Sequence, residues 1–102
     1  MSCEIDKREG RICIRGEMTI YDAVALKGAL LAALADEPSV RLDLADVTEI
    51  DTTGLQLLLL SEKACAARTA SFQIENPSNA VSELFDLLGR PGWAAPKDAA
   101  CQ

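Results

Sequence analysis

Apolar and polar residues alternate near the N-terminus. Ile12 and Ile14 are separated by arginine and cysteine, which is the period of two that a half-buried strand shows. Cys3 and Ile5 indicate a strand before it, and the polar segment 7–10 between the two ends in glycine, as hairpin loops of this length do. The pattern therefore predicts a β-hairpin at the start of the chain.

A helical period follows Gly16. Apolar residues then recur every three or four positions, and these are Ala23, Leu26, Ala29, Leu30 and Ala33. Thr19 lies three residues before Asp22, which is similar to a capping box, where side chains bind free amides at the start of a helix. We expect a helix over about residues 20–35.

The middle of the chain predicts a strand and then a loop. Pro38 closes the connection after the first helix, and residues 40–44 alternate so that their aliphatic side chains share one face of a strand. Val47 and Ile50 are expected to anchor the loop that follows.

A second helix should begin beside Thr53. The run Thr53-Gly54-Leu55-Gln56 has the form S/T-x-x-E/Q before an apolar stretch, which predicts Thr53 as the N-cap of a helix over about residues 54–68. The leucines of segment 55–60 point in nearly every direction around a helix, so they cannot all face one sheet. One stripe should pack on the sheet, and the other should meet either a partner protein or a neighbouring helix.

The last elements are a short strand and a third helix. Residues 71–74 alternate, and segment 76–78 supplies turn and capping residues. Apolar residues then return at helical spacing, namely Val81, Leu84, Phe85 and Leu88. Gly89 suits the position after the helix, and we expect residues 90–102 to be a loosely ordered tail.

The order of elements predicts an α/β fold. Two strand–helix–strand units imply parallel strands with right-handed crossovers, and the hairpin adds an antiparallel edge. We expect a four-stranded mixed sheet with three main helices packed on one side, in a single domain over residues 1–102 with its core at about 3–88. The loops after Gly16 and Leu44 leave the C-terminal ends of strands, so they should lie close together.

Charge and composition narrow the classes of function. The net charge of −6 provides no basic face for nucleic acid or an anionic membrane, and it suits either a partner with a basic surface or simple solubility. The four cysteines lack metal-ligand spacing, and the chain has no histidine, so we expect no metal and no cofactor. No signal peptide or spanning segment is evident, which predicts a cytoplasmic protein with reduced thiols and no direct membrane insertion.

Catalytic arrangements are also missing from the sequence. Without histidine there is no Ser-His-Asp triad, and no glycine-rich phosphate loop of the P-loop or dinucleotide-binding type is present. Carboxylates lie close together at residues 36–37 and at Asp43 with Asp46, but neighbouring acids on loops are usually solvated. We therefore predict that the protein is not an enzyme and has no catalytic residues.

The segment Asp51-Thr52-Thr53-Gly54 is the best candidate for function. It brings a carboxylate and two hydroxyl groups to the start of a helix, where free amides and the positive end of the helix dipole can stabilise a phosphoryl group. The alternative from local chemistry is that Thr53 only caps the helix while Asp51 binds loop amides.

Three segments together resemble the STAS family, which includes the bacterial anti-sigma factor antagonists. They are Gly16-Glu17-Met18-Thr19, Leu42-Asp43-Leu44-Ala45-Asp46-Val47, and Ile50-Asp51-Thr52-Thr53-Gly54-Leu55, which has the family's D-[ST]-[ST]-G-[LV] form. The resemblance implies that a partner kinase phosphorylates the second hydroxyl residue, Thr53, with Thr52 as the second candidate. The unphosphorylated form would bind a kinase-type anti-sigma factor or a related, chemotaxis-linked regulator.

The resemblance also leaves another role open, a constitutive scaffold subunit of a lipid-transport ABC system. In either role we expect a monomer or weak dimer. The predicted partner-binding residues are Asp22, Asp51, Thr52, Thr53, Gly54, Gln56 and Leu57, together with the exposed side of the turn at residues 57–60.

Overall fold

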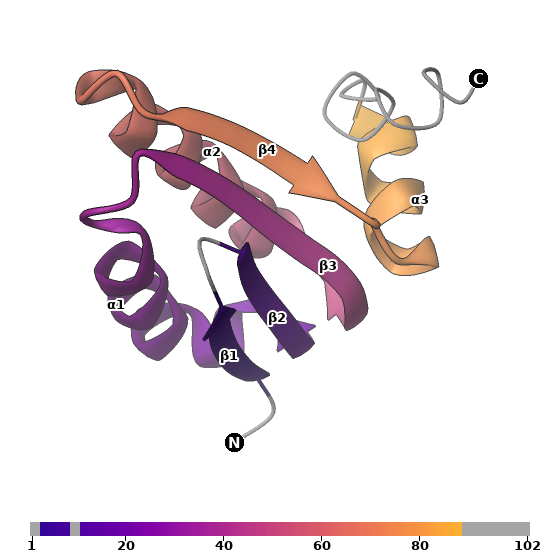
Figure 1. The fold of residues 1–102 in the computed structure, drawn as a ribbon. Coiled ribbons are helices and arrows are strands. Elements are labelled where there is room, and N and C mark those ends of the chain that lie inside the picture. Colours follow the sequence, from indigo (N-terminus) through magenta and orange to yellow (C-terminus); the bar gives the residue numbers. More distant parts are fainter. Residues whose placement is uncertain (1–2, 9–10, 89–102) are drawn as a thin grey trace.

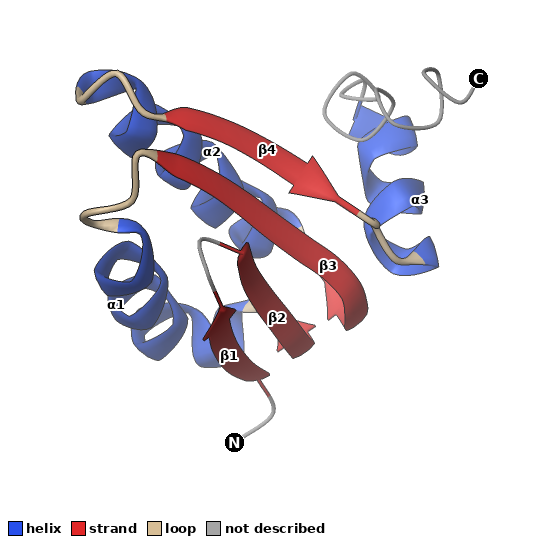
Figure 2. Cartoon of the chain, in the orientation of Figure 1, coloured by secondary structure: helices blue, strands red, loops and turns tan. Residues whose placement is uncertain are grey.

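The computed structural model describes residues 3–8 and 11–88, which form a mixed sheet with helices around it (Figures 1 and 2). The strands are β1 (Cys3–Arg8), β2 (Arg11–Met18), β3 (Ser39–Ile50) and β4 (Ser71–Glu75). The helices are the 3₁₀ turn η1 (Ile20–Asp22), α1 (Ala23–Leu34), α2 (Thr52–Ala67) and α3 (Asn79–Leu88). The predicted Gly89 cap and the tail at 90–102 lie outside the described residues.

The sheet has the strand order β1-β2-β3-β4. β1 pairs with β2 in antiparallel fashion, whereas β2, β3 and β4 are parallel. This confirms the hairpin and the four-stranded mixed sheet that the sequence predicts. Parallel neighbours need crossover connections, and α1 and α2 supply them.

Alternation places the aliphatic side chains of the inner strands on one face, beneath α1 and α2. Ile12, Ile14, Leu42 and Leu44 are fully buried there. The helices contribute Leu26, Leu30, Leu34 and Leu58 to the same core. Burial of this many aliphatic side chains, at about 1.5–3 kcal/mol each, is the main favourable term in folding.

The third helix lies apart from the other two. α1 and α2 pack beside each other against the sheet, as predicted. α3 contacts β3, and in Figure 1 it lies beyond the C-terminal end of β4, apart from α1 and α2. Its Val81 and Phe85 are buried, and hollows lined jointly by α3 and residues 45–50 show that it covers the second half of β3. The predicted four-stranded mixed sheet with three helices is confirmed, and α3 packs against the half of β3 that does not pair with β4.

β3 is much longer than the strand predicted at residues 40–44. It continues to Ile50, so Val47 and Ile50 lie within the strand and do not anchor a loop. Its register against β2 shifts twice, because β3 carries extra residues there. Bulges of this kind break the simple alternation, so the polar residues between Leu44 and Ile50 look like a loop in the sequence.

The first helical segment begins at the predicted residue, Ile20, but it begins as a 3₁₀ turn and lacks the predicted capping bonds. η1 precedes α1, which begins at Ala23, and neither Thr19 nor Asp22 makes a side-chain capping bond. The Thr19 hydroxyl is buried without a hydrogen-bond partner among the described residues. The capping-box prediction fails because the chain tightens into a 3₁₀ turn before the α-helix starts.

The leucine-rich turn of α2 is mostly internal. Leu55, Leu57 and Leu58 are buried, while Leu59 and Leu60 are half-buried. The second stripe therefore meets neighbouring elements of the same chain, including α1. In the described part of the chain, no helix has both the length and the apolar character needed to cross a membrane.

Candidate functional site

Asp51 joins the two loops that leave the C-terminal ends of β2 and β3. Its Oδ1 accepts a hydrogen bond from the Gly54 amide at 3.1 Å, and its Oδ2 accepts one from the Ile20 amide at 3.1 Å. Its own amide donates to the Met18 carbonyl at 3.3 Å. One side chain thus fixes the start of α2 against η1. The loops that meet follow Met18 and Ile50, whereas the predicted loop starts at Gly16 and Leu44 lie within β2 and β3.

Gly54 makes this close approach possible. A Cβ atom at this position would lie 2.3 Å from the Met18 carbonyl oxygen and 2.8 Å from the Ile50 side chain. Both distances are far below van der Waals contact, and the first involves backbone that cannot swing aside. Glycine is therefore required here by space, and not by its backbone angles.

Asp51 is the N-cap of α2, which corrects the prediction of Thr53. The helix begins at Thr52, so Gly54 takes the third position where a capping box needs glutamate or glutamine. A carboxylate also suits this position because it interacts with the positive end of the helix dipole. The Thr53 hydroxyl is consequently not the capping group.

The remaining predicted site residues differ in accessibility. Thr52 and Gln56 are exposed, while Asp22, Asp51 and Thr53 are half-buried. Leu57 is only 7% exposed, so it belongs to the hydrophobic core and offers almost no surface to a partner. The structure thus brings the predicted residues into one neighbourhood but removes Leu57 from the surface.

The sequence interpretation missed an apolar patch next to Asp51. Ile20 is 64% exposed, Tyr21 91% and Val24 89%, and we call these three residues the η1 patch. Ile20 contributes both an exposed side chain and the amide that Asp51 binds. The available signal was that these large apolar residues fall off the helical stripe that begins at Ala23.

Acidic groups surround the base of this site. Burial raises the pKa of the Cys3 thiol, and the carboxylates of Asp22, Glu17 and Glu4 raise it further. Of these carboxylates, that of Asp22 directly follows Tyr21 of the η1 patch in the chain. An apolar patch with an acidic rim matches a partner surface that combines apolar and basic groups.

Most of the chain matches a known family. The family model described as "Mlab, STAS domain" matches residues 1–91, so the chain belongs to the STAS domain family. The anti-sigma-B factor antagonist of Bacillus subtilis (strain 168) is 28% identical over 93 residues, which cover 87% of this chain and 85% of that protein. The family prediction is confirmed.

Two solved structures have the same fold. The anti-sigma factor antagonist SpoIIAA in its unphosphorylated form matches with a TM-score of 0.72 at 17% identity, covering 91% of this chain and 85% of that one. SpoIIAA of Bacillus in its phosphorylated form matches with a TM-score of 0.67 at 16% identity, and the match covers 91% of this chain and 88% of that one. The likeness confirms the predicted SpoIIAA-like sheet with three helices.

Proposed function

We propose that this protein is a phosphorylation-controlled binding module of the anti-sigma factor antagonist type. In its unmodified form it binds a serine/threonine kinase-type partner, and phosphorylation of Thr53 releases that partner. The observation that carries the proposal is the arrangement around Asp51, where a helix start with two threonines adjoins the exposed η1 patch.

Asp51 caps α2, so the Thr53 hydroxyl has no capping role, and this supports Thr53 as the modified residue. Because Asp51 supplies the capping oxygen, modification of the Thr53 hydroxyl removes no cap. A phosphate would gain from the helix dipole but would place about two further negative charges near the Asp51 carboxylate. The fold would therefore tolerate the phosphate while the surface beside the η1 patch became strongly anionic.

The relatives point in the same direction. One relative is named an anti-sigma-B factor antagonist, and SpoIIAA has been solved in phosphorylated and unphosphorylated forms. Thr53 follows Asp51 and Thr52 in the motif that the sequence resemblance identifies. The η1 patch places exposed apolar side chains near Thr53. Such a surface is suited to a transient protein interface, in which a phosphate is costly to desolvate.

A pull-down from the native cytoplasm tests the proposal. The baits are wild type, Thr53→Ala, Thr53→Glu and, as the matched control, Thr48→Glu, which places the same charge on an exposed threonine of β3. Wild type, Thr53→Ala and Thr48→Glu should retain the same kinase. Thr53→Glu should retain at least about ten-fold less, equivalent to about 1.4 kcal/mol of binding free energy.

A second candidate function is a constitutive scaffold subunit of a lipid-transport ABC system. One observation favours it, which is that the Thr53 side chain is half-buried and so less open to a kinase than Thr52. In that case Thr53→Glu and wild type would capture the same transporter ATPase in equal amounts. That result would exclude the switch.

A further inference from the structure

The exposed face of the sheet carries a second concentration of charge, remote from Asp51 in the sequence. A hollow of about 490 Å³ lies across β1, β2 and β3, and we call it the arginine hollow. It is lined by Asp6, Arg8, Arg11, Cys13, Arg15 and Arg41. Four of the ten basic residues of an acidic chain therefore meet at one place.

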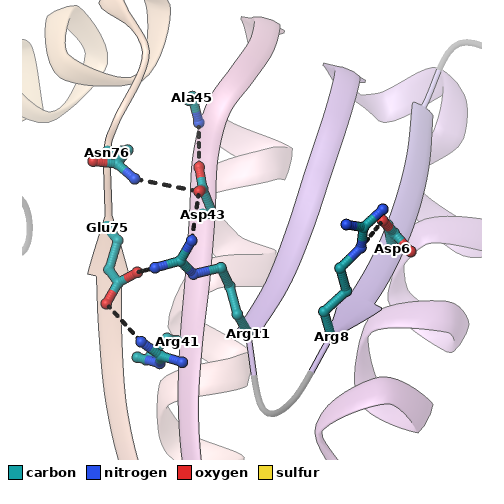
Figure 3. A network of polar contacts seen from close by, with 8 residues as sticks. All are labelled: Asp6, Arg8, Arg11, Arg41, Asp43, Ala45, Glu75 and Asn76. Atoms are coloured by element: carbon teal, nitrogen blue, oxygen red, sulfur yellow. Dashed lines mark hydrogen bonds and ion pairs between the residues drawn. The ribbon is translucent and has the colours of Figure 1, made fainter.

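Strand geometry explains why these residues converge. Arg11, Cys13 and Arg15 alternate with buried Ile12 and Ile14, so their side chains point away from the helices. Arg11 also pairs with Arg41 in the parallel register between β2 and β3. Figure 3 shows Arg8, Arg11 and Arg41 on the same face of the sheet, with the helices behind it.

Each arginine of the hollow has a carboxylate partner, but these are surface ion pairs and some are long. Arg41 Nη1 lies 3.8 Å from Glu75 Oε2, and Arg11 Nη1 lies 4.0 Å from Asp43 Oδ2. Arg15 Nη2 lies 3.3 Å from Glu4 Oε1 in an exposed pair. Surface pairs of this kind contribute about 0–1 kcal/mol, so another anion can replace them at low cost.

One guanidinium donor of the hollow is also unused. Each guanidinium has five N–H donors in a planar fork. Within the described residues, Arg11 Nε is buried and makes no hydrogen bond. Arg11 Nη2 lies 3.3 Å from Glu75 Oε1, yet that oxygen accepts no hydrogen bond among the described residues, so the ion pair is poorly aligned. The hollow therefore combines positive charge with one guanidinium, that of Arg11, whose hydrogen bonds its own carboxylates satisfy only in part.

We propose that the arginine hollow is a binding site for a small phosphate-bearing anion. Arginine forks match the geometry of phosphate oxygens, which accept paired hydrogen bonds. The ligand needs at least two negative charges, because it must displace carboxylates that already neutralise part of the site. The volume suits a small molecule, and the lining has no aromatic side chain on which a base could stack. This site is independent of the function proposed for Asp51 and Thr53.

Calorimetric titration of the full chain with pyrophosphate, and separately with inorganic phosphate, tests the site. Pyrophosphate should saturate one site at a concentration of about 1 mM or less at low salt, and phosphate should bind more weakly. These two arms distinguish a diphosphate-bearing ligand from a single phosphoryl group. Equal, unsaturable heats for both anions would overturn the proposal.

Charge-matched variants locate the site. The double variant Arg15→Gln/Arg41→Gln removes two charges from the hollow, and Lys27→Gln/Lys63→Gln removes two from exposed positions on α1 and α2. The first should weaken pyrophosphate binding at least about ten-fold and the second by less than about two-fold. Equal weakening in both would mean nonspecific attraction and would overturn the proposal. Thermal melting checks that both variants fold.

Removing a carboxylate that competes with the ligand should raise the affinity for pyrophosphate, whereas removing arginines should lower it. Asp6 lines the hollow and binds Arg8 Nε at 3.1 Å, so Asp6→Asn should tighten pyrophosphate binding by about three-fold. Asp36→Asn, at an exposed position after α1, is the control and should change binding little. If Asp6→Asn weakened binding or matched the control, the proposed site would be wrong, even if the arginine double variant failed to fold.

Discussion

The two ends of the α1–α2 pair use the same device with opposite charge. At one end, the Asp51 carboxylate accepts hydrogen bonds from amides at the starts of η1 and α2. At the other end, the Arg68 guanidinium donates to the carbonyls of Leu34 and, at 2.7 Å, of Glu37, just after α1. A negative charge at the start of a helix and a positive charge at its end both interact favourably with the helix dipole.

The surfaces around these ends differ. The η1 patch of large exposed apolar residues adjoins Asp51, whereas no large hydrophobic residue among those described is exposed near Arg68. Both ends therefore hold the fold together through hydrogen bonds, and the exposed apolar residues beside Asp51 are the reason why we propose that end as the binding surface. Variants can separate these two contributions.

Gly54→Ala should have the largest effect on stability. The added methyl group would meet the Met18 carbonyl at 2.3 Å, so β2 and α2 must move apart. We expect a loss of about 3 kcal/mol in the free energy of unfolding. Gly28→Ala is the matched control, because a Cβ there meets no atom within 4 Å and alanine favours helix. Urea denaturation measures both, and a neutral Gly54→Ala would show that the close approach is not needed.

Asp51→Ala and Arg68→Ala should both destabilise the fold. Asp51→Ala loses a cap and a bridge between loops, about 2 kcal/mol, and Arg68→Ala loses two charge-assisted bonds, about 1 to 2 kcal/mol. Only Asp51→Ala should also weaken partner binding, measured by titration at a temperature where both variants are folded. Equal binding losses in the two variants would remove the distinction between the two ends.

Tyr21→Ser/Val24→Ser should separate binding from stability. Both side chains are almost fully exposed, so the free energy of unfolding should change by less than about 0.5 kcal/mol. Binding to the kinase-type partner should fall about ten-fold, because apolar contact area is lost at the interface. Leu87→Ser on α3, which is 78% exposed, is the control for general surface hydrophobicity and should bind like wild type. Equal binding by the double variant and wild type would place the interface elsewhere.

Two buried thiols report the electrostatics of the two ends with smaller effects. Burial raises the pKa of both Cys3 and Cys65, while acidic neighbours raise that of Cys3 and Arg68 lowers that of Cys65. Asp22→Asn should therefore lower the pKa of Cys3, and Arg68→Gln should raise that of Cys65. The pH dependence of alkylation by iodoacetamide, with the other thiols replaced by serine, measures each shift, and shifts of the reverse sign would contradict the account.

The same shifts predict how stability changes at alkaline pH. Both thiols have a folded-state pKa above the ordinary value of 9.0, so the folded state holds their protons more tightly. Their contribution to the free energy of unfolding is present below pH 9.0 and is lost as the pH rises through the folded-state pKa. Urea melts between neutral and alkaline pH should show the decline, and Cys3→Ala/Cys65→Ala should reduce it.

Local pattern was enough to predict the sheet and the helices. The alternation around Ile12 and the helical spacing of Leu26 and Leu30 specify buried faces directly, and both predictions are confirmed. The extension of β3 to Ile50 was not predictable in this way, because its bulges depend on pairing with β2. The position of α3 likewise depends on contacts with β3 that no local period encodes.

The candidate site was only partly predictable. The motif located Asp51 and Gly54, but it assigned the cap to Thr53, since the S/T-x-x-E/Q pattern begins two residues after the true N-cap. The bond from Asp51 to the Ile20 amide joins residues far apart in the sequence. The η1 patch was missed because the exposure of residues near a helix start depends on which distant parts of the chain pack against them.

The central claim is that phosphorylation of Thr53 controls binding at the Asp51 end. The direct test is titration of the purified kinase-type partner with unmodified protein and with protein phosphorylated stoichiometrically at Thr53, confirmed by mass spectrometry. We predict that phosphorylation weakens binding at least about ten-fold while the melting temperature stays nearly constant. Equal affinity of the two forms, or phosphate found on Thr52 with Thr53 untouched, would contradict the claim.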